Sequence, residues 1–313
     1  MNDEYDSPWK EVIEDYFPDF IRFFFPQVYR AIDWNKPYEF LDQELQQLEP
    51  DGEIGKRLVD KVAKVWLVEG QQVWILVHVE VQGKYETIFP ERMYCYNYRL
   101  YDRHHKPVIS LAVLADSNPH WRPNNFSYNI GGCQVSLEFP VVKLLDYESD
   151  WETLEETTNP FGIIVMAHLK TRATHKNPAS RLNWKLSLVR RLYEGGYNRS
   201  DVVKLFRFID WIMFLPPELA RGFKAEVRNY EEVRKVRYVT SIERLAREEG
   251  IIEKGREDTL EILSTRFGSV PNSMIEVING IEEQSVLNTL FKRAITIGNL
   301  GEFQQLLEQT IAQ

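Results

Sequence analysis

One stretch, from Leu58 to Gln82, constrains the fold more than any other part of the chain. Its two halves, residues 58–68 and 72–82, are rich in Val, Ile, Leu and Trp, and they flank the short segment 69–71, which contains Gly70. β-Branched and aromatic runs on both sides of a glycine-containing turn are typical of an antiparallel hairpin. The chain is therefore expected to build a β-sheet around this hairpin.

Two carboxylates fall at matching places in the two halves of the hairpin. A turn centred on Gly70 predicts that Asp60 lies directly opposite Glu80, with Gln82 two positions further along the same face. Directly opposed residues have Cβ atoms roughly 4.5–5.5 Å apart, and like charges there are destabilising. A divalent cation bound by both carboxylates would remove this repulsion. The alternative is ordinary surface charge on a half-exposed strand, with a different register separating the two residues.

The bulk composition is that of a globular protein. Of 313 residues, 43% are hydrophobic and 13% aromatic, which argues against disorder. No apolar run approaches the roughly 20 residues that span a bilayer, and the acidic start lacks a signal-peptide pattern, so we expect a cytoplasmic protein without membrane contact. The two cysteines, Cys95 and Cys133, are too few for a cysteine-rich zinc site.

The net charge of −9 conceals a strong asymmetry along the chain. Residues 1–169 contain 15 Lys and Arg against 28 Asp and Glu, whereas residues 170–249 contain 18 against 10. The middle segment, at +8, is compatible with binding to a phosphate backbone. A solvated, charge-rich helical surface explains the same numbers without nucleic acid.

The expected elements follow the order helix, three strands, helix, strand and further strands. Residues 8–25 have helical periodicity interrupted by Pro18, and residues 38–45 suit either a short strand or a helical turn. Helix 89–103, strand 107–116 and further strands within 126–147 come after the hairpin. This order predicts a mixed α/β sheet with a central crossover helix.

From about residue 151 onward, helical patterns replace strand patterns. Helices are expected at 161–169, 179–194, 199–214 and 217–230, and the charged residues 231–257 suit a long exposed helix or a linker. Three domains are predicted, at 1–157, 158–257 and 258–313. The last is expected to be a small helical module with a core of Leu260, Leu263, Phe267, Ile275, Ile278, Ile281, Leu287, Leu290, Ile295, Phe303, Leu306 and Leu307.

The order of elements and the hairpin carboxylates resemble the PD-(D/E)xK nuclease superfamily. The residues that carry the resemblance are Asp60, the strand Val77-His78-Val79-Glu80-Val81-Gln82, and Arg92 and Tyr98 on the helix that follows. The chain is most similar to the recombination-promoting nuclease family, which is transposase-like and in which Gln often replaces the motif Lys. Over roughly residues 5–150, the resemblance implies a restriction-endonuclease-like core. It also implies Mg²⁺ or Mn²⁺ held by Asp60 and Glu80, and DNA as the substrate.

The chain departs from the superfamily pattern at Gln82, where most members have Lys. An amide can orient a water molecule or contact the substrate, but it cannot act as a general base. Lys64, on the Asp60 face of its strand, and Lys84 are the candidates to supply the missing amine. The role of Gln82 therefore decides whether the site hydrolyses DNA.

Three further residues are candidates by position. The first helix offers Glu11 or Glu14 as an additional acidic residue, since such helices commonly contribute one in the superfamily. Arg92 is expected either to contact a substrate phosphate or to form an ion pair on the surface of its helix.

Residues 258–310 resemble a small helical domain of unknown function that often follows such nucleases, most clearly at Arg266-Phe267-Gly268 and Pro271.

The sequence therefore predicts a magnesium-dependent DNA endonuclease linked to recombination or mobile elements. A catalytically inactive protein with the same fold, acting as a DNA-binding or protein-interaction module, remains the alternative because of Gln82. The chain has no Walker loop, no Gly-x-Ser-x-Gly elbow and no His-Glu-x-x-His motif. The sequence does not determine the oligomeric state, and both a monomer and a homo-oligomer are compatible with it.

Overall fold

The computed structural model describes residues 6–41, 59–68, 72–80, 86–236, 238–281 and 283–311. Contacts divide the chain into two compact units, Met1–Tyr230 and Glu231–Gln313. The first unit holds the whole expected nuclease-like segment and most of the basic helical segment, while the expected boundaries at 157/158 and 257/258 stay predictions. No helix within the described ranges is long and apolar enough to cross a membrane.

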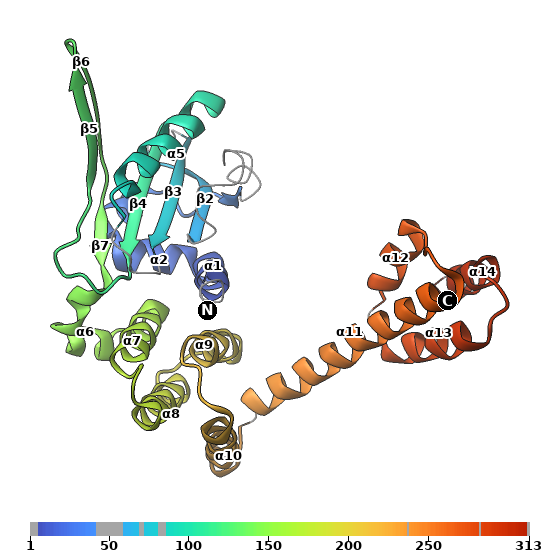
Figure 1. Cartoon of the computed structure of the whole chain (residues 1–313). Coiled ribbons are helices and arrows are strands. Elements are labelled where there is room, and N and C mark those ends of the chain that lie inside the picture. The colour runs from blue at the N-terminus through green and yellow to red at the C-terminus, as the bar shows by residue number, and fades with distance from the viewer. Residues whose placement is uncertain are drawn as a thin grey trace. The chain divides into compact units, whose positions relative to one another are not determined.

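A five-stranded sheet with the order β1-β2-β3-β4-β7 lies at the centre of the first unit (Figure 1). Its strands are β1 (Glu39–Phe40), β2 (Val59–Trp66), β3 (Gln72–Glu80), β4 (Val108–Leu114) and β7 (Val141–Lys143). β1, β2 and β3 pair antiparallel, whereas β4 runs parallel to both β3 and β7. A parallel pair needs a crossover connection, and helix α5 (Phe89–His104) lies between β3 and β4 in the chain. The expected mixed α/β sheet with a crossover helix is confirmed.

Helices cover both faces of this sheet. Tyr96 and Leu100 of α5 pack on Val62 of β2, and Phe89 and Met93 pack on Leu114 of β4. On the other side of β2 lies the first helix, α1 (Asp6–Asp15), followed by α2 (Phe17–Phe24) and α3 (Pro26–Ala31). The expected helix over 8–25 is thus two helices.

Pro18 accounts for this break between α1 and α2. It occupies the first turn of α2, where its missing N–H costs nothing and its fixed φ suits a helix start. Both helices bury their apolar sides completely, Trp9 and Ile13 from α1 and Phe17 and Phe20 from α2. The break therefore lets α1 pack on β2 while Phe20 and Phe24 of α2 pack on Phe161.

A second, two-stranded sheet is formed by β5 (Asn125–Ile130) and β6 (Cys133–Glu138), which together are called the ribbon below. The ribbon turns through Gly131 and Gly132, whose φ angles are 58° and 83°. Left-handed conformations at both positions of a two-residue loop match the twist of a hairpin, and glycine adopts them without strain. In Figure 1 the ribbon projects from the first unit beside α5.

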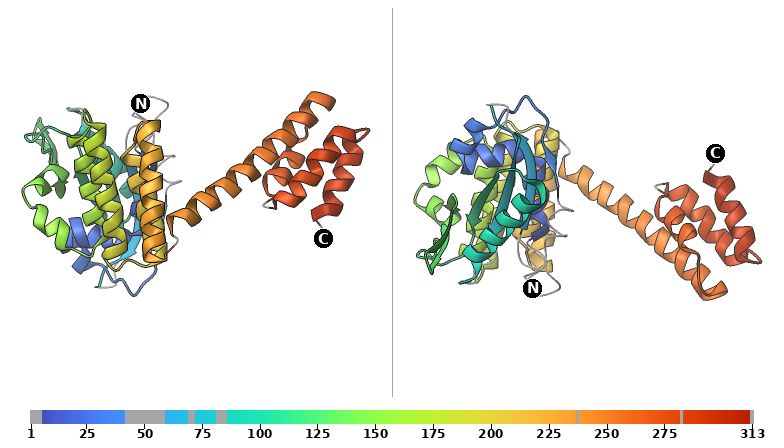
Figure 2. Two further views of the ribbon diagram at one scale, coloured as in Figure 1. Left: turned by 90° about the horizontal axis from the view of Figure 1, so that it is seen from below. Right: turned by 90° about the horizontal axis from the view of Figure 1, so that it is seen from above.

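Helices follow the sheet for the remainder of the first unit. They are the 3₁₀ helix η1 (Leu144–Glu148), α6 (Trp151–Glu156), α7 (Pro160–Ala173), α8 (Pro178–Glu194), α9 (Arg199–Ile212) and α10 (Pro217–Arg234). Asn159, Asn177 and Asn198 each accept a backbone N–H and so begin α7, α8 and α9. The helices α7 to α10 are seen nearly end-on in Figure 1 and along their length in the left view of Figure 2.

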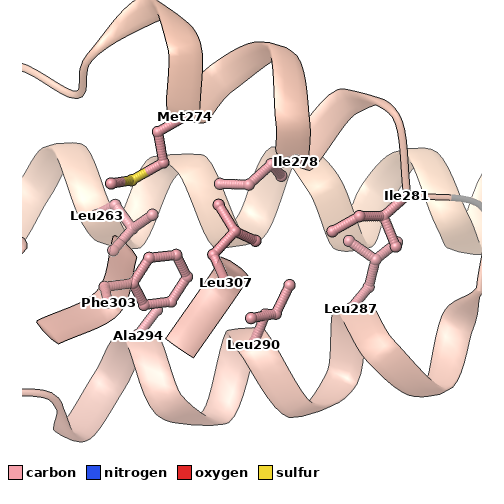
Figure 3. Packing of buried hydrophobic residues seen from close by; sticks show 9 residues of the cluster. All are labelled: Leu263, Met274, Ile278, Ile281, Leu287, Leu290, Ala294, Phe303 and Leu307. Carbon is pink, nitrogen blue, oxygen red and sulfur yellow. The ribbon is translucent and has the colours of Figure 1, made fainter. Parts of the chain in front are cut away.

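The second unit contains α11 (Val239–Phe267), α12 (Asn272–Asn279), α13 (Gln284–Thr296) and α14 (Leu300–Ile311). The charged stretch 231–257 thus contributes to the 29-residue helix α11, as one of the two alternatives expected. The buried cluster, drawn in Figure 3, consists of Leu263, Met274, Ile278, Ile281, Leu287, Leu290, Ala294, Phe303 and Leu307.

This cluster corrects two of the expected core residues. Ile295 is 49% exposed, and Ile275 is only partly buried. Their neighbours Met274 and Ala294 are buried instead, because the inward faces follow the spacing 274 and 278 in α12 and 287, 290 and 294 in α13. The expected core residues Ile278, Ile281, Leu287 and Leu290 are confirmed, so only one residue near each stripe was wrong, by one position.

Candidate functional site

The register of β2 and β3 corrects the expected pairing of the two carboxylates. Asp60 lies opposite His78, and the paired residue numbers sum to 138, so that Glu80 is not directly opposite Asp60. The shift is an even number of residues, so Asp60 and Glu80 remain on one face. They are diagonal neighbours, and such positions lie roughly 7–8 Å apart.

Residues 31–33 pair with the other edge of β2, the one that faces β1. Asp33 N–H donates to the carbonyl of Trp66, and Val68 N–H donates to the carbonyl of Ala31, at distances of 2.8 and 3.0 Å. Ile32 and Leu67 form a β-bridge between them, and Leu41 N–H donates to the Val62 carbonyl on the same edge. These bonds extend the β1 edge of β2 and do not involve the groups that pair with β3, where pairing ends at Trp66 and Gln72.

The neighbours of Asp60 and Glu80 identify the face on which they lie. Val62, two residues after Asp60, packs on α5, and Leu114, the β4 partner of Glu80, packs on the first turns of α5. Both carboxylate residues therefore belong to the face that α5 covers. Their side chains, and residues 81–85 including Gln82 and Lys84, lie outside the described part of the structure.

The first helix meets β2 on the opposite face. The carboxylate of Glu14 lies 2.9 Å from Nζ of Lys61, whose side chain is almost fully buried. Lys61 follows Asp60 directly, so strand alternation turns it to the other face. Glu11 lines a cavity of about 210 Å³ that α1 forms with α9. Neither glutamate is brought to the face of Asp60.

Lys64 is on the expected face but distant from Asp60. Four residues separate them along β2, which corresponds to roughly 13 Å. Nζ of Lys64 lies 3.4 Å from the carboxylate of Glu39 in β1, and Lys64 pairs with Trp74 across the hairpin. The structure thus engages Lys64 at the β1 edge of the sheet.

Arg92 is buried in the first turns of α5. Its Nη1 lies 3.1 Å from the carboxylate of Glu86, and its guanidinium is 5.7 Å from the ring centroid of Phe89. Glu86 belongs to the segment that leads from β3 into α5. Arg92 therefore forms a buried ion pair with a residue that precedes α5, not an ion pair on the helix surface, and its contact with a substrate phosphate stays a prediction.

A buried ion pair between Asp116 and Lys143 was not predicted from the sequence. Both side chains are almost fully buried, at 1% and 0% exposure, and Lys143 Nζ also donates to the Trp121 carbonyl at 3.3 Å. Burial lowers the pKa of Lys143, and the neighbouring Asp116 opposes that shift. A lone lysine in the apolar run Val141–Leu145 was the signal that could have indicated it.

This ion pair lies in the same row of the sheet as Glu80. Leu114 pairs with Glu80 on one side and with Lys143 on the other. Helix α7 is tied to the same end of β4, because Arg172 Nη1 donates to the Asp116 carbonyl and His168 Nε2 lies 3.2 Å from the Ala115 carbonyl. Because both side chains are sealed from solvent, the pair holds the end of β4 against β7.

Among the side chains that the structure describes, no three His, Cys, Asp or Glu residues lie close enough to hold a metal ion. Asp60 and Glu80 are outside that set, so their candidacy depends on backbone register. Comparison of the chain with family models, with curated proteins and with solved structures finds no match. Function is therefore argued from the residues themselves.

Proposed function

We propose that this protein is a metal-dependent DNA endonuclease whose site is formed by Asp60 and Glu80 on the α5-covered face of the sheet. The observation that carries the proposal is the β2–β3–β4 register. In this register Asp60 of β2 is a diagonal neighbour of Glu80, the last residue of β3. The resemblance to the recombination-promoting nuclease family selects the same two residues, and it links the activity to recombination or mobile elements.

The donor set fits a hard cation. Two carboxylates supply the oxygen ligands that Mg²⁺ and Mn²⁺ prefer, and they leave room for water and a phosphate oxygen. When bound, such a cation makes a water molecule more acidic and neutralises charge on the phosphate. Asp60 and Glu80 would hold it, and Gln82 would orient the attacking water or the phosphate by hydrogen bonds.

A second function has its own support. The usual amine is absent at Gln82, and the structure engages Lys64 with Glu39, roughly 13 Å from Asp60 along the strand. A protein with this arrangement would bind DNA, or a protein partner, without hydrolysis. The two functions share the fold and differ in turnover, so they are separable by experiment.

Cleavage of supercoiled plasmid tests the first function directly. We expect nicking with Mg²⁺ or Mn²⁺, none with chelator, and at least a hundredfold loss in Glu80→Ala, because both carboxylates are required to hold the cation. Glu152→Ala is the matched control, since it removes an exposed glutamate of α6 and changes the net charge equally. Equal nicking by wild type and Glu80→Ala would refute the assignment of the site.

Metal titration separates the two functions if no cleavage is seen. A cation that binds only the native state raises the melting temperature, and Asp60→Asn should abolish this rise. A metal-dependent rise without cleavage would favour the inactive alternative. The absence of both would reject a metal site at these residues.

A further inference from the structure

The ribbon has two chemically different faces. Its register pairs Phe126 with Leu137, Tyr128 with Val135 and Ile130 with Cys133 on one face. The alternate pairs are Asn125 with Glu138, Ser127 with Ser136, and Asn129 with Gln134. One face is thus apolar, and the other carries only amides, hydroxyls and, at the end remote from the turn, one carboxylate.

The apolar face rests on α5. The ring of Phe126 stacks on Tyr94 with centroids 4.9 Å apart and planes inclined by 23°. A two-stranded hairpin is marginal on its own in water, so this contact gives the ribbon its support. All six residues of the polar face are exposed, whereas the apolar face is exposed only towards the turn, at Tyr128, Ile130 and Cys133.

The turn end of the ribbon is narrow. Gly131 and Gly132 carry no side chains, and a Cβ added at either would meet nothing within 4 Å. The polar pair nearest the turn is Asn129 and Gln134. Two strands side by side are about the size that the major groove of B-DNA admits.

The charge of this region is suited to a polyanion. The chain has 47 acidic residues in 313, about one in seven, but residues 117–137 contain none. They do contain His120 and Arg122, the second of which is paired with Asp146. The ribbon can thus approach phosphates without the repulsion that most of the surrounding acidic segment would cause.

We propose that the turn end of the ribbon enters the major groove of duplex DNA, where Asn129 and Gln134 contact base edges. This inference rests on DNA being the substrate of the proposed function. Asparagine and glutamine amides pair bidentately with adenine N6 and N7, and an apolar side chain contacts the thymine methyl group. Ile130, 73% exposed beside the turn, belongs to the opposite face of the ribbon, so the base contacts are assigned to the two amides alone. The ribbon therefore favours sites that contain A·T pairs.

A second copy of the chain is the rival occupant. A stable dimer interface has a predominantly apolar centre, whereas the polar face of the ribbon carries no apolar side chain, and the exposed apolar residues of the other face are only Tyr128, Ile130 and Cys133. DNA fits the polar face better because its grooves are read by hydrogen bonds.

Binding to a labelled duplex of about three helical turns, measured in chelator so that no cleavage occurs, tests the inference. We expect Asn129→Ala/Gln134→Ala to weaken binding about tenfold or more, and to lose enrichment of adenine when sites are selected from randomised duplexes. The control Asn288→Ala/Gln305→Ala removes one asparagine and one glutamine side chain from exposed positions of the second unit, and it should bind DNA like the wild type.

A gain-of-function variant excludes misfolding as the cause. Ser127→Arg adds a cation to the polar face and should tighten binding severalfold at low salt. Unchanged affinity and selection in the alanine variant would overturn the inference. The inference would also be overturned if the alanine variant changed the sedimentation of the protein but not its DNA binding, because the ribbon would then be a contact between copies of the chain.

The cleavage and binding experiments distinguish failure of this inference from failure of the proposed function. Normal cleavage with ribbon-independent binding would reject the ribbon's role alone. Ribbon-dependent binding without any metal-dependent cleavage would reject hydrolysis and leave the ribbon as a DNA-binding element.

Discussion

Replacing Lys143 by methionine should destabilise the first unit more than any exposed ion-pair substitution. The methionine side chain is similar in length and apolar, so the change removes the ammonium group and little volume. It leaves the Asp116 carboxylate, 1% exposed, without its cation. The Trp121 carbonyl also loses a donor at 3.3 Å.

The expected cost follows from this burial. Removing one partner of a buried ion pair costs about 3–5 kcal/mol, because the remaining charge must stay buried or take up a proton. Removing an exposed partner costs about 1 kcal/mol or less. Arg122→Met supplies that comparison, since Arg122 pairs with Asp146 nearby and the two side chains are 47% and 53% exposed. For a unit of this size the buried loss corresponds to a fall in melting temperature of roughly 10 °C.

Urea unfolding followed by tryptophan fluorescence measures this loss in the first unit alone, because all eight tryptophans lie between residues 9 and 211. Asp116→Asn/Lys143→Met should regain most of the stability, since no buried charge remains. If Lys143→Met costs no more than Arg122→Met, the pair does not hold the end of β4 as argued.

Two further substitutions test the core around α7. Burial lowers the pKa of His168 from 6.5 to about 4. Between these pH values the unfolded chain binds a proton at His168 and the folded unit does not. The free energy of unfolding should therefore fall by up to roughly 3 kcal/mol as pH drops from about 6.5 to 4. His168→Gln retains a donor for the Ala115 carbonyl without titrating, so urea midpoints at pH 7 and 4.5 should differ less than in wild type; an equal difference would contradict the assignment. Gly162→Ala should cost about 1–3 kcal/mol, because its Cβ would collide with Cγ2 of Thr157 and lie 3.1 Å from the Leu154 carbonyl. Thr157→Ser should recover part of that loss in urea unfolding, and no recovery would mean that the backbone contact dominates.

Local features of the fold were predictable from the sequence. The apolar runs on both sides of Gly70 predicted the β2–β3 pair, and Pro18 predicted the break between α1 and α2. Crossover helix α5 and strand β4 followed from periodicity and from the punctuation around Pro107. In each case the determining residues are close together in the chain.

The hairpin register was not predictable in the same way. A turn centred on Gly70 predicts Asp60 opposite Glu80, whereas the structure pairs Asp60 with His78. The composition of the two strands fits both registers, because they differ by an even number of residues. The correct face survived only because the error was an even number of residues.

The Asp116–Lys143 pair was missed for a related reason. Its partners lie on β4's end and on β7, 27 residues apart, with the ribbon between them in the sequence. A pattern of apolar residues predicts which positions are buried, but it does not identify the carboxylate that a buried lysine will meet. Such pairs become evident only when the strand order is known.

The anchoring of β4 at residues 115 and 116 has a consequence for how the molecule moves. His168 and Arg172 of helix α7 contact the carbonyls of residues 115 and 116, and Lys143 of β7 forms an ion pair with the Asp116 carboxylate. Sliding of β4 relative to α7 would break these bonds together, so this end of the strand behaves as a fixed point. Glu80, whose partner Leu114 directly precedes that point, has a stationary neighbour on one side. Adjustment of the carboxylate pair is therefore left to β2.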